Sequence, residues 1–341
     1  MTTDFLTRAY EPGDETAILG LFHRAFHSER SLAHWRWKYA QSPFGRFNIS
    51  LTFAATGELA AHYAGYPVPF HEFVHGEAVE HATLQIGDTM TAPEFRHVGR
   101  GSTSVLGRAV QHFYATFCDA KVAFNYGFNT ANIQRLGLRF FNVRRIEDVG
   151  YWVLENPRPR LRGTLPFSLY RIEPVSAVGP EWDQLYGRLA PRFPAMVART
   201  ASYLDWRYLR CPDPGFQMLA ARRRTQLVGW IVVRKAGDDL IWGDALLDPD
   251  HTGAARPLLR AAVAAHPEVR RITAWFADRS ARAGEAPDAA VQWAEQLRRL
   301  GFSRQPEPNA LALVTVPFLK GAATEPLLSR AYWARGDGDL F

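Results

Sequence analysis

Apolar residues recur every three or four positions from residue 17 to residue 26, which predicts an amphipathic helix. The residues on its apolar face are Ala17, Ile18, Leu21, Phe22, Ala25 and Phe26. Pro12, Gly13 and Asp14 come directly before it, and we expect Asp14 to cap the first free N–H groups of the helix. The same spacing predicts a helix that follows residue 104 and a short helix over 130–138.

Runs of apolar and β-branched residues predict the strands of the first half at 47–55, 59–68, 81–91, 121–126 and 151–154. We expect the last of these to close the sheet of this half. In the second half, predicted strands at 217–222, 227–235, 240–247 and 271–276 are interspersed with predicted helices at 182–189, 255–265 and 290–300. The pattern predicts an α/β fold with a mixed sheet in each half.

The two halves share short sequence matches in the same order. Trp37-Lys38-Tyr39 with Pro43 recurs as Trp206-Arg207-Tyr208 with Pro212, 169 residues later. Two weaker matches pair residues 57–61 with 225–229 and residues 138–141 with 299–302. Three matches at nearly constant offset indicate duplication of one fold.

The boundary between the copies is expected in the segment 156–163, where two prolines and three arginines suit an exposed linker. We therefore predict a first domain at 1–155, a linker at 156–167, a second domain at 168–318 and a tail at 319–341.

Composition narrows the classes of function. The 40 Lys and Arg against 34 Asp and Glu give a net charge of +6 without a long basic run, so we do not expect nucleic acid as a partner. Cys118 and Cys211 are far apart, which predicts no structural disulfide and a reducing, cytoplasmic location. No signal-peptide pattern or long apolar window is present, so we expect no membrane partner. His71, His75 and His81 lack metal-ligand spacing, so no metal is expected.

Candidate chemistry gathers in Arg96-His97-Val98-Gly99-Arg100-Gly101, which stands between a predicted strand and a predicted helix. The first N–H groups of a helix lack partners and attract anions. Two glycines leave room for a phosphate to approach the backbone, and two arginines add charged donors. This segment is expected to bind a phosphate or pyrophosphate.

R-x-x-G-x-G after a strand that ends in Pro93-Glu94-Phe95 resembles the coenzyme A loop of the GNAT acyltransferase superfamily. Asn129, followed by a helix and by Leu138-Arg139-Phe140-Phe141, resembles the second signature of that family. The resemblance covers residues 4 to about 154 and implies two tandem GNAT domains. It implies an acyl-CoA co-substrate contacted by Met90, Thr91, Arg96, His97, Val98, Gly99, Arg100, Gly101, Ser102 and Asn129.

Two features depart from the family pattern. Leu136 stands where many members carry a tyrosine that protonates the leaving thiolate, so Tyr126 or Tyr114 would have to replace it. In the second half, the matching loop carries Asp248 and Asp250 and lacks the leading arginine, which indicates a degenerate copy without cofactor. Tandem domains with one working half resemble the architecture of mycothiol synthase-like enzymes.

Asp88 is the candidate catalytic base or amine anchor, because it is a carboxylate in an otherwise uncharged strand. A carboxylate held by backbone N–H groups is the alternative reading. Trp37, Tyr63 and Tyr66 are candidate acceptor-binding residues, although packing would also explain the Trp37 cluster because the second half repeats it.

The sequence thus predicts an N-acyltransferase that moves an acyl group, most simply acetyl, from acyl-CoA to a primary amine of a small molecule. It is expected to be a monomer or homodimer. Two alternatives remain open: an acyltransferase that takes its donor from an acyl carrier protein, and a non-catalytic CoA-binding or scaffold protein.

Overall fold

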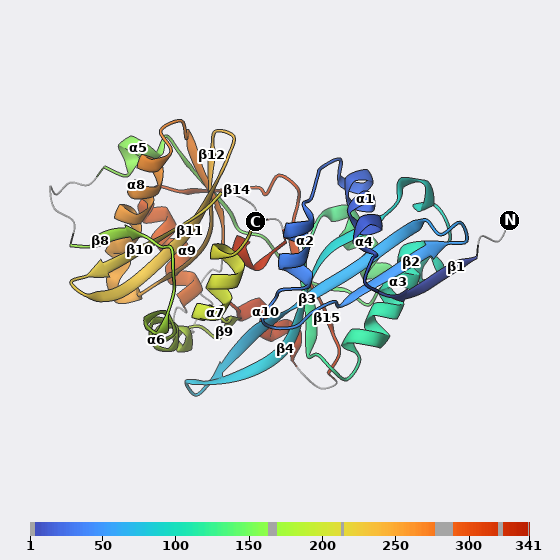
Figure 1. The fold of residues 1–341 in the computed structure, drawn as a ribbon. Helices are drawn as coiled ribbons and strands as arrows, with labels where there is room; N and C mark the ends of the chain where they lie inside the picture. The colour runs from blue at the N-terminus through green and yellow to red at the C-terminus, as the bar shows by residue number, and fades with distance from the viewer. Residues whose placement is uncertain (1–3, 163–168, 213–214, 277–288, 320–322, 340) are drawn as a thin grey trace. The chain divides into compact units, whose positions relative to one another are not determined.

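The chain forms two compact units, each built around one β-sheet (Figure 1). The computed structural model describes residues 4–162, 169–212, 215–276, 289–319, 323–339 and 341. Unit 1 contains Met1–Phe70, His81–Asp148 and Leu311–Ser329. Unit 2 contains His71–Glu80, Val149–Ala310 and Arg330–Phe341.

The sheet of unit 1 has the strand order β1-β2-β3-β4-β5-β15-β6, and β4 and β5 run parallel. Its strands are β1 (Phe5–Ala9), β2 (Ile49–Ala54), β3 (Leu59–Val74), β4 (Glu77–Thr91), β5 (Phe124–Asn129), β6 (Arg144–Asp148) and β15 (Ala312–Pro317). Its helices are α1 (Glu15–Phe26), α2 (Leu32–Tyr39), α3 (Val105–Phe113), α4 (Ala131–Phe140) and α10 (Thr324–Arg330). The short β9 (Ala195–Val197) pairs with β3.

The sheet of unit 2 has the order β14-β7-β13-β12-β11-β10-β8, with β12 and β13 parallel. Its strands are β7 (Tyr151–Glu155), β8 (Arg171–Pro174), β10 (Phe216–Arg223), β11 (Gln226–Ala236), β12 (Asp239–Leu247), β13 (Arg271–Trp275) and β14 (Ser303–Gln305). Its helices are α5 (Pro157–Arg160), α6 (Pro180–Leu189), α7 (Ala201–Leu204), α8 (Ala255–Ala265) and α9 (Ala289–Leu300).

The two sheets have matching strand orders, and each receives one strand from the other copy. In unit 1, β15 lies between β5 and β6. In unit 2, β7 takes the corresponding place between β13 and β14. The α/β fold class is confirmed, but the prediction that residues 151–154 close the first sheet is wrong, because β7 pairs with β13 and β14.

The expected domain boundaries differ from the units for the same reason. Residues 312–317 were expected in the second domain, and they form part of the first sheet. The expected exposed linker is partly helix α5. Pro157 in this helix is buried and Leu161 after it is 1% exposed, so the segment packs into unit 2. Residues 163–167 lie outside the described residues.

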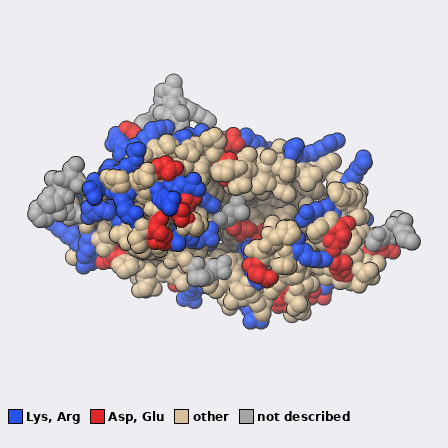
Figure 2. All heavy atoms as spheres, turned by 90° about the horizontal axis from the view of Figure 1, so that it is seen from above, with Lys and Arg blue, Asp and Glu red and all other residues tan. Residues whose placement is uncertain are grey.

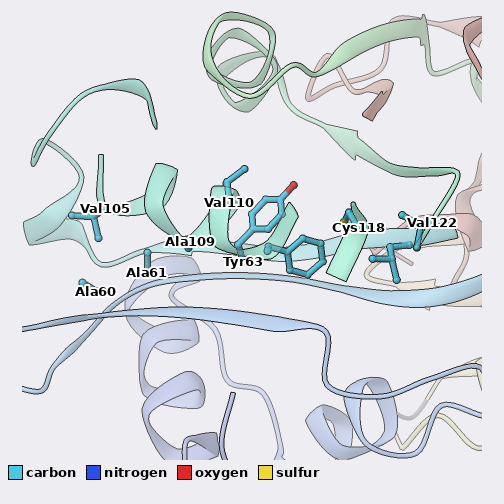
Figure 3. Close-up of a cluster of buried hydrophobic side chains, with 10 residues drawn as sticks. Ala60, Ala61, Tyr63, Val105, Ala109, Val110, Cys118 and Val122 are labelled. Carbon is cyan, nitrogen blue, oxygen red and sulfur yellow. The ribbon is translucent and has the colours of Figure 1, made fainter. Parts of the chain in front are cut away.

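The core of unit 1 lies between its sheet and α3, on the opposite face from α1 and α2 (Figure 3). Small residues Ala60 and Ala61 on β3 allow α3 to approach, and its apolar face supplies Val105, Ala109 and Val110. This face has the helical spacing that the sequence showed. The core fixes α3 and therefore the loop that leads into it.

The start of α1 is as predicted, but its cap is different. Asp14 occupies the N-cap position and its side chain makes no cap hydrogen bond. It instead accepts two hydrogen bonds from the Arg8 guanidinium, at 2.7 and 2.8 Å, and one from the Glu11 N–H. Because the carboxylate binds the Arg8 side chain on β1, it does not cap the first turn of α1.

Candidate functional site

The loop between β4 and α3 requires glycine at two positions. Gly99 and Gly101 have φ angles of 75° and 54°, in the left-handed region that side chains disfavour. A Cβ atom on Gly99 would lie 2.5 Å from the Thr103 carbonyl oxygen. A Cβ atom on Gly101 would lie 2.6 Å from the Phe140 ring. Larger residues would therefore distort the loop.

The backbone of this loop presents N–H groups that have no acceptor. Within the described part of the chain, no hydrogen bond is formed by the amides of Gly99, Arg100, Gly101 and Ser102. Helix α3 begins after Ser104, whose Oγ accepts the Gly107 N–H at 3.0 Å. Free amides beside a helix start favour an anion.

Basic side chains surround these amides. Arg96, His97 and Arg100 are exposed, and the Arg96 Nε donates to the Thr91 carbonyl oxygen at 3.3 Å. No acidic residue occurs from residue 95 to residue 118. The loop therefore has the charge and the donors that a phosphate needs.

Strands β4 and β5 separate beside this loop. Their parallel pairing covers three residue pairs and ends at Gln85 and Tyr126, although β4 continues to Thr91 and β5 to Asn129. Beyond that point, the facing edges of the two strands do not pair with each other. The split leaves backbone groups available to a ligand that enters between the strands.

A pocket of about 530 Å³, including its open mouth, occupies this split. It is bounded by β4, α3, β5, α4 and β15. The residues that line it are Tyr63, Ile86, Thr89, Leu106, Val110, Tyr114, Asn125, Tyr126, Gly127, Asn129, Ile133, Leu136, Gly137, Phe141, Val143, Val314, Thr315 and Val316. Most of its walls are therefore apolar, and the polar groups are few.

The structure brings only some of the predicted cofactor contacts to this pocket. Of those contacts, Asn129 lines it. The predicted catalytic residue Tyr126 also lines it, as does Leu136 at the position of the missing tyrosine. Met90 does not line it and is 2% exposed, so only its backbone remains available as a predicted contact. Thr89, which precedes Met90 in β4, lines the pocket instead.

Asp88 is held in a buried cluster of charges. Its backbone has a φ of 51°, which marks an irregular point in β4. Its carboxylate accepts hydrogen bonds from Lys38 Nζ at 3.0 Å, from the Tyr39 hydroxyl at 2.8 Å and from the Arg30 guanidinium. The side chains of Lys38 and Asp88 are 2% and 5% exposed, so water does not screen this attraction.

These partners make Asp88 a poor base. Burial alone would raise the pKa of Asp88, but Lys38 and Arg30 hold that pKa well below its usual range. A carboxylate that binds protons so weakly does not take one from an amine near neutral pH. Asp88 is also absent from the pocket lining. The structure thus favours a structural role for Asp88 over that of catalytic base.

A similar cluster is present in unit 2, where the arginine also forms an ion pair with a second buried carboxylate, Asp337. Asp244 accepts hydrogen bonds from Arg199 Nε at 2.9 Å and from the Tyr208 hydroxyl at 2.6 Å. Arg199 and Tyr208 stand 169 residues after Arg30 and Tyr39. Arg207 replaces Lys38 and donates to backbone carbonyl groups of residues 336, 338 and 341. The duplicated W-[KR]-Y motif therefore supplies a buried charge cluster in each copy.

Sequence reasoning missed the partner of this motif, although a signal was present. Gly87-Asp88 is followed by Pro93, and Gly243-Asp244 is followed by Pro249 at the same spacing. This match lies 156 residues apart, against 169 for the aromatic motif. Linking both repeats would have indicated that the two aspartates share a role that does not depend on a working cofactor site.

The three predicted acceptor-binding residues do not form one site. Tyr66 lies beside the charge cluster, with its ring 5.5 Å from Lys38 Nζ. Trp37 is 5% exposed and its ring contacts His34. Tyr63 lies on the α3 side of the sheet, where it lines the pocket (Figure 3).

His62 supports the irregular point in β4. Its Nδ1 lies 2.7 Å from the Asp88 carbonyl oxygen, and the side chain is fully buried. Burial lowers the pKa of His62 to about 4, with Lys38 and Arg30 adding to this effect against the opposing pull of Asp88. The ring is therefore neutral at pH 7 and donates its Nδ1–H to the carbonyl.

In unit 2, aromatic rings gather where the parallel strands end. Trp242 is the last residue of β12 that pairs with β13. Its ring packs against Phe276 at 5.2 Å and Trp293 at 5.4 Å, and Phe276 also contacts Tyr332. Such rings bury a large area and fill space. This packing supports the prediction that the second copy has no cofactor, which stays a prediction.

No helix in the described part is long and apolar enough to cross a membrane. Among the residues that the structure describes, no group of three or more His, Cys, Asp or Glu is arranged to hold a metal ion.

Comparison with known proteins gives structural neighbours only. No family model and no curated protein sequence matches the chain. A GCN5-related N-acetyltransferase from Anabaena variabilis ATCC 29413 matches with a TM-score of 0.62 and 13% identity, over 92% of this chain and 72% of that one. One from Kribbella flavida matches with a TM-score of 0.58 and 14% identity, over 92% and 71%.

A conserved protein of unknown function from Enterococcus faecalis V583 matches with a TM-score of 0.61 and 13% identity, over 93% of this chain and 74% of that one. Because these matches extend over nearly the whole chain, both units contribute to the likeness. The chain has the fold of the GCN5-related N-acetyltransferases, and identity this low shows the fold alone.

Proposed function

We propose that unit 1 binds an acyl-CoA thioester and transfers its acyl group to a primary amine of a small molecule. The observation that carries this proposal is that the free amides of Gly99 to Ser102 and the pocket between β4 and β5 belong to one unit. The loop suits a pyrophosphate, and the apolar pocket suits the arm that joins a pyrophosphate to a thioester.

The proposed reaction is an attack of the amine nitrogen on the thioester carbonyl carbon. A C–N bond forms, the C–S bond breaks, and the thiolate leaves with the electron pair of that bond. The carbonyl oxygen gains negative charge during the attack, and backbone N–H groups on the unpaired edge of β4 beyond Gln85 are the candidate donors. Bound acyl-CoA supplies the activated acyl group.

Protons have to move at two atoms. The amine must lose one to attack, and because the pKa of Asp88 is so low, we assign this step to water or to a base other than Asp88. The leaving thiolate must gain one. We propose Tyr126 as its donor, because Tyr126 lines the pocket at the point where β4 and β5 separate.

The charge distribution fits a small anionic ligand. On the face shown in Figure 2, acidic side chains lie among the basic ones. Many of the basic groups in unit 2 are paired, as Arg222 is with Glu173 and Glu181. In the cofactor loop of unit 1, by contrast, Arg100 forms no ion pair with any described residue. A local phosphate site accounts for this better than a nucleic-acid surface does.

The test is thermal unfolding of the whole chain with and without acetyl-CoA. A ligand at 100 times its dissociation constant adds about 2.7 kcal/mol to stability, which is a measurable shift. We expect the wild type to shift, and Arg96→Ala and Gly101→Glu to lose the shift. Gly253→Glu in the corresponding loop of unit 2 is the matched control, since a Cβ there would meet only ordinary contacts at 3.5 Å.

A shift in all four proteins would place the ligand outside the unit 1 loop. No shift of the folded wild type with any acyl-CoA would refute donation by free CoA. A shift without transfer to any amine in a broad screen would leave the non-catalytic alternative. If acyl groups move only from a carrier protein, the loop binds the phosphopantetheine group that is attached to that protein. The loop contains no acidic residue that would repel the phosphate of this group.

A further inference from the structure

The inner end of the unit 1 pocket differs from its apolar walls, and we infer that it is a subsite for a neutral polar group at the far end of a short acyl chain. This inference rests on the proposed function. It is carried by three hydrogen-bonding side chains at one end of a pocket whose other walls are mainly aliphatic: Tyr63, Tyr114 and Asn125.

The pocket has an outer and an inner end. Ile133 and Leu136 on α4 are 36% and 46% exposed, so they mark the mouth. Asn125 and Val316 are each 3% exposed and mark the interior. Asn125 pairs with Leu84, one position inside the point where β4 and β5 separate. A thioester arm that enters from the loop therefore reaches this end with its acyl group.

Asn125 is incompletely satisfied at this end. Its Oδ1 accepts the Val316 N–H at 3.0 Å, which fixes the orientation of the amide. Its Nδ2 is buried and forms no hydrogen bond of good geometry in the described chain, although it lies close enough to the Tyr114 hydroxyl to oppose the rise in the pKa of that group. An amide NH₂ that is buried without an acceptor is costly, so a site that a ligand completes is the physical explanation for keeping it.

Two tyrosine hydroxyl groups lie at the same end. Tyr63 extends from β3 toward α3, with its hydroxyl directed away from the strand (Figure 3). Its oxygen lies 3.5 Å from that of Tyr114, a distance at which a hydrogen bond is weak. Each hydroxyl thus keeps capacity for a ligand atom. Tyr63, Tyr114 and Asn125 are thus largely buried side chains at one end of the pocket, and each can donate a hydrogen bond to a ligand there.

The charge of the group is constrained as well. Burial raises the pKa of Tyr114 to about 12, and it also raises the pKa of Tyr63. The groups that act on these hydroxyls are each other, Asn125 and the Cys118 thiol, and none of them is a cation. A carboxylate would be desolvated there without a counter-charge. A hydroxyl, ketone or amide fits, because it accepts hydrogen bonds without carrying charge.

The pocket therefore selects a hydroxyacyl or similarly substituted acyl group over a plain alkyl chain of equal length. A site built to bond a polar substituent rejects the analogue that lacks it, because its own buried groups are then left unpaired. The methyl end of a plain acyl chain would leave Asn125 Nδ2 without a hydrogen-bond acceptor.

Calorimetric binding to the full chain tests this without knowledge of the acceptor. The probes are free CoA, butyryl-CoA, 3-hydroxybutyryl-CoA, 4-hydroxybutyryl-CoA and succinyl-CoA. We expect at least one hydroxybutyryl thioester to bind about tenfold or more tightly than butyryl-CoA, and succinyl-CoA to bind more weakly than that thioester. Free CoA provides the affinity that does not depend on the acyl group.

Two variants assign the preference to the subsite. Tyr114→Phe removes one hydroxyl and keeps the ring, and Asn125→Leu keeps the volume of the side chain and removes the NH₂ group together with the oxygen that accepts the Val316 N–H. We expect both to reduce the preference about tenfold and to leave the affinity for free CoA unchanged. Tyr186→Phe is the matched control, because it removes a hydroxyl in unit 2, where Tyr186 contacts His71.

The inference is overturned if no hydroxybutyryl thioester binds more tightly than butyryl-CoA, if succinyl-CoA binds most tightly of all, or if both folded variants retain the full preference. Failure of the proposed function looks different, because free CoA itself would then not bind the wild type. That outcome would overturn both proposals together.

Discussion

Replacing Asp88 with asparagine tests the buried charge cluster of unit 1. The introduced amide has nearly the same size as the carboxylate, so packing is preserved, while Arg30 and Lys38 lose their counter-charge. Lys38 is 2% exposed and Arg30 is 13% exposed, so water compensates little. Removing one partner of a buried ion pair costs about 3–5 kcal/mol. For a unit of this size, we expect the unfolding temperature to fall by roughly 10 °C.

The assay is calorimetric unfolding of the full chain at pH 7, with two comparison variants. Tyr39→Phe removes one hydrogen bond to a charged group and should cost about 1.5–3 kcal/mol, less than Asp88→Asn. Asp244→Asn removes the corresponding carboxylate of unit 2, but the buried Arg199 keeps its ion pair with Asp337, so this change should destabilise less than Asp88→Asn. Three effects in this order would establish a structural role.

The pH dependence gives an independent check. The pKa of Asp88 is lower in the folded chain than in the unfolded chain, so its stabilisation is complete above the unfolded value of about 3.9. It is lost as the pH falls below that value toward the folded pKa. If Asp88→Asn instead melts like the wild type at pH 7 and abolishes acyl transfer, the reasoning is refuted and Asp88 is the base.

Three other changes are informative. Tyr126→Phe should lower kcat by roughly 10²–10⁴-fold, with CoA affinity unchanged, if Tyr126 protonates the thiolate; steady-state rates with titration of CoA decide this. The pKa of His62 is about 4 in the folded chain and about 6.5 in the unfolded chain, so the wild type should lose stability as the pH falls from 6.5 toward 4. His62→Gln should remove that loss, and chemical unfolding at several pH values measures it. Gly107→Ala should abolish CoA binding and destabilise unit 1, because the new Cβ would lie 2.2 Å from the Gly101 carbonyl oxygen; a variant that binds CoA normally would contradict the assigned loop geometry.

Most helices and strands, and the glycine-containing loop after β4, could be predicted from the sequence alone. The predicted helix over 255–265 coincides with α8, and the strands 217–222, 227–235 and 240–247 match β10, β11 and β12 within a residue or so at each end. These segments have strong periodicity, and local packing determines them. The Gly99 and Gly101 positions were also predictable, because glycine adopts the left-handed φ angles found there more readily than any other residue.

The roles of single polar residues were harder to predict. The sequence shows Asp88 as a charge in an otherwise uncharged strand, but its partners Arg30 and Lys38 lie 58 and 50 residues away in the sequence. Only the folded chain shows that they meet. A second occurrence at Asp244 was the available clue, because the loop after Asp244 lacks the leading arginine and the second glycine of the unit 1 loop, so the shared aspartate does not depend on them.

The exchanged strands could not be predicted from local pattern. Residues 151–154 and 312–317 are both short apolar runs, and each suits the vacant place in either sheet. Because the two copies have the same fold, pairing preferences do not separate the two arrangements. The boundary of each unit therefore depends on which sheet each of these strands joins in the folded chain, and the composition of the strands does not determine it.

The exchange of β7 and β15 also determines when the chain can fold. The Val316 N–H bonds to Asn125 across 191 residues of sequence, so the first sheet stays incomplete until the segment that contains β15 has left the ribosome. Before that, β5 and β6 have an open place between them that an apolar strand from another molecule could enter. Expressing residues 1–155 alone would make that state permanent and would leave β7 without its sheet. The two copies are interlaced along the polypeptide, and cutting the gene between them would yield fragments that need each other to fold.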